Sequence, residues 1–169
     1  MSMFIHHEGA FLSFTEFMLS ESIRMKEIKY GTDPKTSNGK IEKEGKMLWT
    51  VFEKKGTYFF MMYDTTTGVA GFGASDTWTG DMMGDLDKFT NQRTMSFQAF
   101  TVFGHAFYVL MKMVDKANSS VIKFDGADNK LDGAYDRMVK NKPFMQDIED
   151  KGWVYKGKIK NQHTFVKNR

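Results

Sequence analysis

Apolar residues in the second half of the chain recur in patterns that predict alternating helices and strands. Through residues 97–117 they return every three or four positions, the spacing of an amphipathic helix. Ser96 stands just before this stretch, where an N-cap is expected. A short apolar strand over Val121–Phe124 follows, and then a second helix that begins at Gly133–Met138. The apolar face of the long helix consists of Phe97, Phe100, Gly104, Phe107, Leu110, Met111 and Val114.

A further strand opens at Trp153–Tyr155, after Gly152. Helices and strands that alternate in this way indicate an α/β or α+β fold, with helices covering the faces of a sheet. The first half of the chain predicts one more helix. Ser13 and Glu16 have the spacing of a capping box, and the helix that they open carries its apolar residues through Ile28. Those residues are Phe14, Phe17, Met18, Met25 and Ile28.

Three strand-like runs lie between residues 47 and 74. They cover Met47–Glu53, Thr57–Tyr63 and Val69–Ala74, and short turn sequences separate them, so an antiparallel meander is predicted. The middle run contains Tyr58-Phe59-Phe60, which indicates a strand buried on both faces. We therefore expect a mixed, mostly antiparallel sheet, which Val121–Phe124 should also join. The segment before these strands, residues 31–45, is polar and rich in turn signals.

A polar insertion over about residues 76–94 separates the meander from the long helix. Loops of this length are usually functional or ordered by a partner. Its apolar members have no predicted helix or strand to bury them, so we interpret them as a protein-binding surface. They are Trp78, Met82, Met83 and Phe89. No linker or repeat divides the chain, and residues 1–169 are predicted to form one domain that this insertion interrupts.

Composition restricts the chemistry that the chain can perform. The absence of cysteine excludes disulfides, cysteine nucleophiles and thiolate metal sites. His6, His7 and Glu8 are ligand-type residues, but adjacent positions cannot all face one ion, so no metal site is predicted. A net charge of +3 is too small to argue for nucleic acid. No signal peptide or membrane-spanning run is present, which favours a soluble protein inside the cell.

Residues from about Met47 onward resemble a known family in their order of elements and in one motif. Asp128 or Asn129 precedes Ala134-Tyr135-Asp136-Arg137-Met138, and Gly152-Trp153 follows. This arrangement resembles the GNAT superfamily of N-acetyltransferases. Within it, Val121–Met138 looks most like small GNAT-like proteins of tailed phages. The resemblance implies a sheet in which the strand after the long helix splays away from its neighbour, with helices on both faces. It also implies a tyrosine on the following helix.

The same resemblance implies acetyl-coenzyme A as a cofactor. The family binds its pyrophosphate at the N-terminus of the helix after the fourth strand, through Arg/Gln-x-x-Gly-x-Gly/Ala. Gln92, Arg93 and Ser96 stand at the corresponding place. Met95 and Phe97 depart from the pattern, since they put bulk where glycines would let backbone N–H groups approach the phosphates.

Acetyl transfer needs a general acid and a general base. Tyr135 is the candidate acid for the leaving thiolate, and the alternative is a tyrosine that only packs its ring on the sheet. Glu53, Asp76 and His105 are eligible as the base by residue type alone. His105 follows Gly104 within the long helix, and its alternative interpretation is a histidine on the polar flank of that helix.

Two hypotheses about function follow. In the first, the chain is a GNAT-like phage protein without catalysis, a virion component or a factor that binds a host protein, found in the virion or in the host cytoplasm. In the second, it is an acyl-coenzyme-A-dependent N-acetyltransferase that acts on an amine. The departures in the phosphate loop and the unmarked base favour the first hypothesis.

Overall fold

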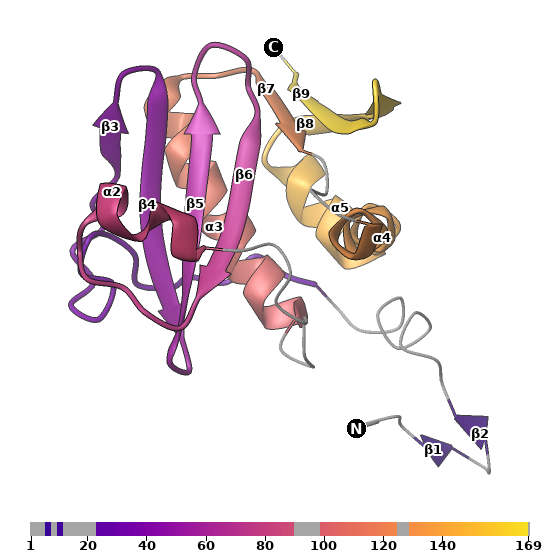
Figure 1. The fold of residues 1–169 in the computed structure, drawn as a ribbon. Coiled ribbons are helices and arrows are strands. Elements are labelled where there is room, and N and C mark those ends of the chain that lie inside the picture. The colour runs from indigo at the N-terminus through magenta and orange to yellow at the C-terminus, as the bar shows by residue number, and fades with distance from the viewer. Residues whose placement is uncertain (1–5, 8–9, 12–22, 90–98, 125–128, 169) are drawn as a thin grey trace.

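The computed structural model of the chain describes residues 6–7, 10–11, 23–89, 99–124 and 129–168. They form an α+β fold with two larger antiparallel sheets (Figure 1). The first sheet has the order β3-β4-β5-β6, and the second has the order β7-β9-β8. A pair of two-residue strands, β1 and β2, stands apart from both sheets. The strands are β1 (His6–His7), β2 (Ala10–Phe11), β3 (Glu42–Glu44), β4 (Met47–Lys54), β5 (Thr57–Asp64), β6 (Ala70–Ser75), β7 (Val121–Phe124), β8 (Trp153–Ile159) and β9 (Gln162–Lys167).

Helices cover both faces of the first sheet (Figure 1). The long helix α3 (Ala99–Ala117) packs on one face. The short helix α2 (Met82–Asp85) lies on the other face and continues into the 3-10 turn η1 (Leu86–Lys88). Beside the second sheet lie α4 (Asn129–Met138) and α5 (Lys142–Asp150). The predicted helix over residues 97–117 is therefore confirmed for its described part.

The predicted meander is confirmed, because β4, β5 and β6 pair antiparallel in chain order. Side chains of β5 alternate between two hydrophobic clusters. Phe59, Met61 and Tyr63 enter the main core under α3, whereas Phe60 belongs to a smaller outer cluster with Trp49. Both faces of the strand are therefore buried, as its aromatic sequence predicted.

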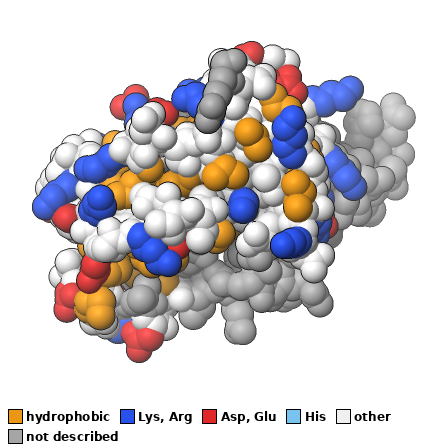
Figure 2. Space-filling model, turned by 90° about the horizontal axis from the view of Figure 1, so that it is seen from above, with side chains coloured by type: hydrophobic (Ala, Val, Ile, Leu, Met, Phe, Trp, Pro, Cys, Tyr) orange, Lys and Arg blue, Asp and Glu red, His pale blue; other side chains and the backbone are white. Residues whose placement is uncertain are grey.

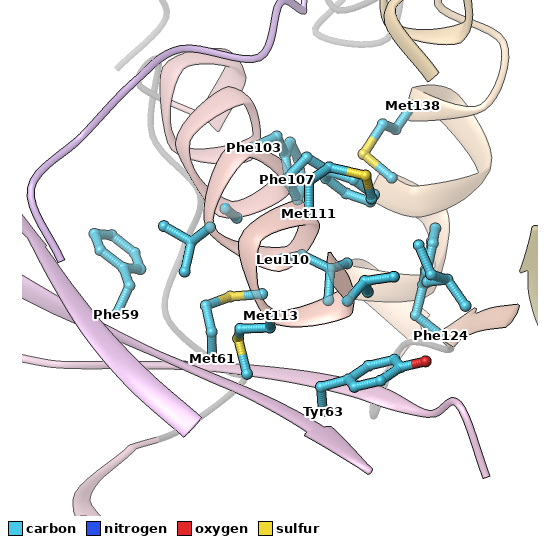
Figure 3. Packing of buried hydrophobic residues seen from close by; sticks show 14 of the residues in the cluster. Phe59, Met61, Tyr63, Phe103, Phe107, Leu110, Met111, Met113, Phe124 and Met138 are labelled. Carbon is cyan, nitrogen blue, oxygen red and sulfur yellow. The ribbon is translucent and has the colours of Figure 1, made fainter. Parts of the chain in front are cut away.

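The main core joins the two sheets (Figure 3). Phe107 of α3 lies at its centre and is 4 % exposed. Its ring meets Phe144 of α5 edge-on at 4.7 Å between centroids, and Phe124 of β7 at 5.6 Å. Such edge-to-face pairs add to the stabilisation that comes from apolar burial. Met61 and Met113 lie between α3 and the strands of the first sheet, whereas Met138 enters the core from the end of α4.

The helix predicted through Ile28 is wrong for its last part. Residues 23–29, which we call the strap, have no helical structure. Their N–H groups bond to partners far along the chain: Ile23 to Asn141 Oδ1 at 3.3 Å, Met25 to Asp147 Oδ2 at 3.1 Å and Lys26 to the Gly104 carbonyl at 3.2 Å. A helix would have used these donors locally. The capping box at Ser13–Glu16 lies outside the described residues.

Two further predictions are corrected at the second sheet. The strand Val121–Phe124 was expected in the same sheet as the meander, but β7 pairs with β9 over its whole length. Only one parallel bridge, Val69 to Lys123, connects it with the strand before α3. The helix predicted to begin at Gly133–Met138 is α4, which begins earlier, at Asn129, and ends at Met138. Helix α5 follows it as a separate helix. Asn141 starts α5 by accepting a hydrogen bond from the Phe144 N–H at 3.2 Å.

Candidate functional site

The candidate site is the place where β6 and β7 diverge. The Lys123 N–H donates a hydrogen bond to the Gly68 carbonyl at 2.8 Å, so β7 lies beside the residues that lead into β6. The two strands then separate into different sheets, and α3 fills the angle between them (Figure 1). An apolar cleft lies in this angle, with a cavity of about 20 Å³. It is lined by Met61, Ala70, Gly71, Phe72, Phe103, Ala106, Phe107, Leu110, Phe124 and Tyr135.

Tyr135 carries the only polar side chain in the lining of this cleft. It stands on α4 and is 6 % exposed. Its ring meets Phe124 edge-on, with 4.8 Å between centroids, and lies 6.0 Å from Phe103. The tyrosine is therefore packed on the sheet, and it also borders the cleft.

The cleft also borders a free strand edge. β6 is the last strand of its sheet, and the Asp64 N–H donates to the Val69 carbonyl at 2.8 Å. Hydrogen bonds alternate along an antiparallel pair, so the backbone groups of Ala70, Phe72 and Ala74 point away from β5. Such an edge can accept an extended ligand as if it were another strand.

A polar network that the sequence did not predict holds α4 beside the second sheet. The buried His163 of β9 lies with Nδ1 2.7 Å from the Tyr155 hydroxyl and Nε2 3.0 Å from Asp136 Oδ1. Lys158 Nζ lies 3.2 Å from the same carboxylate oxygen. Burial, followed by the Asp136 charge, raises the pKa of Tyr155. Because Asp136 is next to Tyr135, the network fixes the turn of α4 that borders the cleft.

The residues predicted to bind pyrophosphate, Gln92, Arg93 and Ser96, lie outside the described residues. None of the three eligible bases lines the cleft. Glu53 and His105 both line a different groove, on the other side of α3. Asp76 is exposed and follows the end of β6.

Three of the four apolar residues of the insertion pack against their own sheet. Met82 is buried in the outer cluster, and Trp78 and Phe89 pack against it. The Trp78 indole N–H also donates to the Thr32 carbonyl at 2.8 Å. Met83 is different, since 72 % of it is exposed. The sequence did not predict helix α2, which buries Met82 against the sheet and leaves Met83 at the surface.

Asp85 anchors the insertion. Its buried carboxylate accepts hydrogen bonds from the Thr79 N–H at 2.6 Å and the Thr79 hydroxyl at 2.8 Å, and Lys88 Nζ lies 2.9 Å away. These donors, with the Thr79 N–H first, lower the pKa of Asp85 to about 2. The carboxylate is therefore ionised at neutral pH, and its role is to hold residues 79–88 together.

Comparison with known proteins gives no match of the chain to a family model, a curated protein or a solved structure. Two further findings concern the described residues as a whole, one about membranes and one about metal ions. Among the residues that the structure describes, no helix is both long enough and apolar enough to cross a bilayer. Within the same residues, no group of three or more histidine, aspartate or glutamate side chains could hold a metal ion.

Proposed function

We propose that the chain binds an acyl-coenzyme A between β6 and β7 and transfers the acyl group to an amine. The observation that carries this proposal is the divergence of the two strands around an apolar cleft that Tyr135 borders. An extended amide-bearing arm fits the edge of β6 beyond its bridge to β7, where Phe72 and Ala74 offer backbone donors and acceptors. The cavity itself is small, so the acyl chain must be short or displace Phe72, which is partly exposed.

In this reaction the amine nitrogen attacks the thioester carbonyl carbon, an amide bond forms and the carbon–sulfur bond breaks. The attacking nitrogen loses one proton, and the leaving thiolate gains one. Tyr135 supplies the proton to the sulfur in our proposal. No described residue of the cleft lining other than Tyr135 could exchange a proton, so the amine must enter neutral. The proton that its nitrogen loses after the attack passes to water, and water returns a proton to Tyr135.

Calorimetric titration with acetyl-coenzyme A tests the binding step. Ala70→Phe places a ring at the mouth of the cleft and should weaken binding at least tenfold. Ala117→Phe is the matched control, because Ala117 is also partly exposed at the rim of the core but does not line the cleft. The proposal fails if the protein does not bind acetyl-coenzyme A saturably, or if both variants bind like the original chain.

Tyr135→Phe tests the chemical step. The variant keeps the ring that packs on Phe103 and Phe124, so fold and binding should persist. Turnover should fall about 100-fold or more, the usual contribution of a positioned acid. Arg93→Ala should weaken binding by about 1–3 kcal/mol if its guanidinium pairs with the pyrophosphate. Unchanged turnover in Tyr135→Phe would remove the tyrosine from the mechanism.

The second candidate function is a non-catalytic, GNAT-like phage protein that binds a host or virion protein. The exposed Met83 favours it, since an unbranched thioether at the surface suits an adaptable interface. Affinity capture from infected cells with the original chain and with Met83→Asp tests this candidate. Ile159→Asp is the control, because Ile159 is the other large apolar residue described as exposed, at 51 %. Equal capture by all three would contradict a role for Met83.

A further inference from the structure

The walls of the cleft between β6 and β7 differ in how much of each reaches the surface. Seven of the ten lining residues, from β5, α3, β7 and α4, are at most 6 % exposed. The other three, Ala70, Gly71 and Phe72, are partly exposed and all belong to β6. Phe72 is therefore the only large side chain of the lining that reaches the surface. The seven buried residues are Met61, Phe103, Ala106, Phe107, Leu110, Phe124 and Tyr135.

The buried walls are locked by rings that lie behind them or beside them. Phe107 meets Phe144 of α5 edge-on, with 4.7 Å between centroids, and Phe124 stacks on Phe165 of β9 at 5.7 Å. Tyr135 in turn meets Phe124 edge-on at 4.8 Å. Close-packed interiors have few voids into which a side chain can retreat. A ligand that is larger than the cavity therefore cannot make room by displacing these rings.

Phe72 is held in a different way. Its ring stacks on Phe59 of β5 with 5.6 Å between centroids and 12° between planes, and Phe59 stacks on Phe52 of β4 at 5.1 Å. Phe72 is thus the last ring of a row that crosses three neighbouring strands. Among the ring pairs of the described residues, Phe72 takes part only in this one. The row sets the position of the ring, and partial exposure gives Phe72 room to turn outward that the other large walls lack.

The cavity that these walls enclose holds one small group. A cavity of about 10–15 Å³ is enough for a single water molecule. The cleft has about 20 Å³, and all of its lining side chains except that of Tyr135 are apolar. A methyl group is close to a water molecule in size. The cavity therefore fits the methyl end of an acetyl group, whereas a longer chain needs space that the Phe72 ring now occupies.

We propose that Phe72 sets the length of the acyl group that the cleft accepts, so that an acetyl group fits and chains of four carbons or more are excluded. This inference rests on the acyl-coenzyme A function proposed above, and it names the class of acyl donor. Apolar pockets discriminate by about 10–200-fold between ligands that differ by one methylene group. A difference of several methylene groups is therefore readily measurable.

Calorimetric titration with acetyl-, butyryl- and hexanoyl-coenzyme A measures this selectivity. The quantity compared is the ratio of the Kd of the hexanoyl ester to the Kd of the acetyl ester, because a general loss of affinity cancels in it. We expect a ratio of at least about ten for the original chain. In Phe72→Ala the ratio should fall below about two, since the ring that blocks longer chains is gone. Phe72→Leu should give an intermediate ratio, and it remains informative if Phe72→Ala does not fold.

Tyr58→Ala is the matched control. Tyr58 is another partly exposed aromatic residue of the same sheet, but it packs against the outer cluster and does not line the cleft. Its ratio should equal that of the original chain. The inference is overturned if the original chain binds the hexanoyl ester as tightly as the acetyl ester, or if both Phe72 variants keep the original ratio. A ratio that falls equally in Tyr58→Ala would also overturn it.

Benzene is a probe that does not depend on coenzyme A. It has the shape of the ring that Phe72→Ala removes, and engineered apolar cavities bind it. The ¹³C signal of the Met61 methyl group reports on the cleft, because Met61 lines it and is 3 % exposed, and Met61→Leu assigns the signal. On the face in Figure 2, the apolar side chains drawn in colour lie in patches among charged and polar ones. Benzene should shift the Met61 signal saturably in Phe72→Ala and leave it unchanged in the original chain and in Tyr58→Ala.

The two probes distinguish failure of this inference from failure of the proposed function. If no coenzyme A ester binds saturably to any of the proteins, the acyl-transfer function fails, and benzene alone decides whether Phe72 limits the size of the cleft. A benzene shift confined to the Phe72 variants would support that role. Equal shifts in the original chain and in the variants, or no shift in any of them, would overturn it.

Discussion

Phe107 shows how much one side chain contributes to this core. It is 4 % exposed and its ring contacts rings from α5 and β7, so its removal leaves a cavity between three elements. We expect Phe107→Ala to lower the free energy of unfolding by about 3–5 kcal/mol in urea denaturation. Met83→Ala, at an exposed position, should change it by less than about 0.5 kcal/mol. A loss below about 1 kcal/mol for Phe107→Ala would contradict its central place in the core.

His105 should make stability depend on pH. Burial lowers its pKa in the folded chain, whereas the unfolded chain has the ordinary value of about 6.5. Below that pH the unfolded state binds a proton that the folded state does not, so stability falls as the pH falls. The slope from this one group is at most about 1.4 kcal/mol per pH unit.

Urea denaturation between pH 7.5 and pH 5 measures this dependence. His105→Asn removes the titrating group and should flatten the curve relative to the original chain. Lys26 and Lys54, whose charges also lower the pKa of His105, remain in both proteins, so the difference isolates the imidazole. Parallel curves for the two proteins would show that His105 titrates normally.

At the scale of elements, Gly104 decides how closely the strap approaches α3. A Cβ built at this position would overlap the Arg24 carbonyl oxygen. Alanine normally stabilises a helix interior by up to about 1 kcal/mol over glycine. We expect the opposite for Gly104→Ala, a loss of about 1–3 kcal/mol, because the strap must move away.

Gly133→Ala on α4 is the matched control for this change. A Cβ there meets only the end of the Arg137 side chain at 3.5 Å, an ordinary contact distance. That variant should be neutral or slightly more stable in thermal denaturation. If both variants gain stability, the contact between strap and helix is looser than the structure indicates.

At the scale of the whole molecule, Gly68 joins the two sheets. Its carbonyl accepts the Lys123 N–H at 2.8 Å, its φ is +76°, and a Cβ would lie 2.6 Å from Val121 Cγ1. Gly68→Ala should therefore lower the free energy of unfolding by more than backbone strain alone would. Gly56→Ala provides the comparison, because Gly56 has a φ of +80° with nothing within 4 Å of its Cβ.

Amide hydrogen exchange reports on this joint directly. Exchange of the Lys123 N–H should accelerate at least tenfold in Gly68→Ala and remain unchanged in Gly56→Ala. The free energy of unfolding should fall by about 1–2 kcal/mol in both variants, because alanine is strained in left-handed backbone. It should fall further in Gly68→Ala, where the new Cβ overlaps Val121. Equal exchange rates in the two variants would mean that the bridge between the sheets does not depend on Gly68.

The sequence by itself determined the local elements of this protein. Strands over residues 47–53 and 57–63 follow from short apolar runs bounded by turn sequences, and the helix over residues 97–117 follows from a period of 3.6 residues. Each segment carries these signals within itself. The family resemblance implied a tyrosine on the helix after Val121–Phe124, and Tyr135 stands on α4, where it borders the cleft.

Only the tertiary structure decided the arrangement of the strap, the second sheet and the surroundings of His105. The strap has apolar residues at helical spacing, yet its backbone bonds to Gly104, Asn141 and Asp147, partners about 80 to 120 positions away. Val121–Phe124 has the sequence of any buried strand, and its pairing with β9 depends on residues about 40 positions later. The sequence allowed His105 to be a general base or a histidine on the polar flank of its helix. The structure shows that the strap covers it, so that it is buried. Periodicity reports only which face of a segment is apolar, whereas long-range backbone partners determine what covers that face.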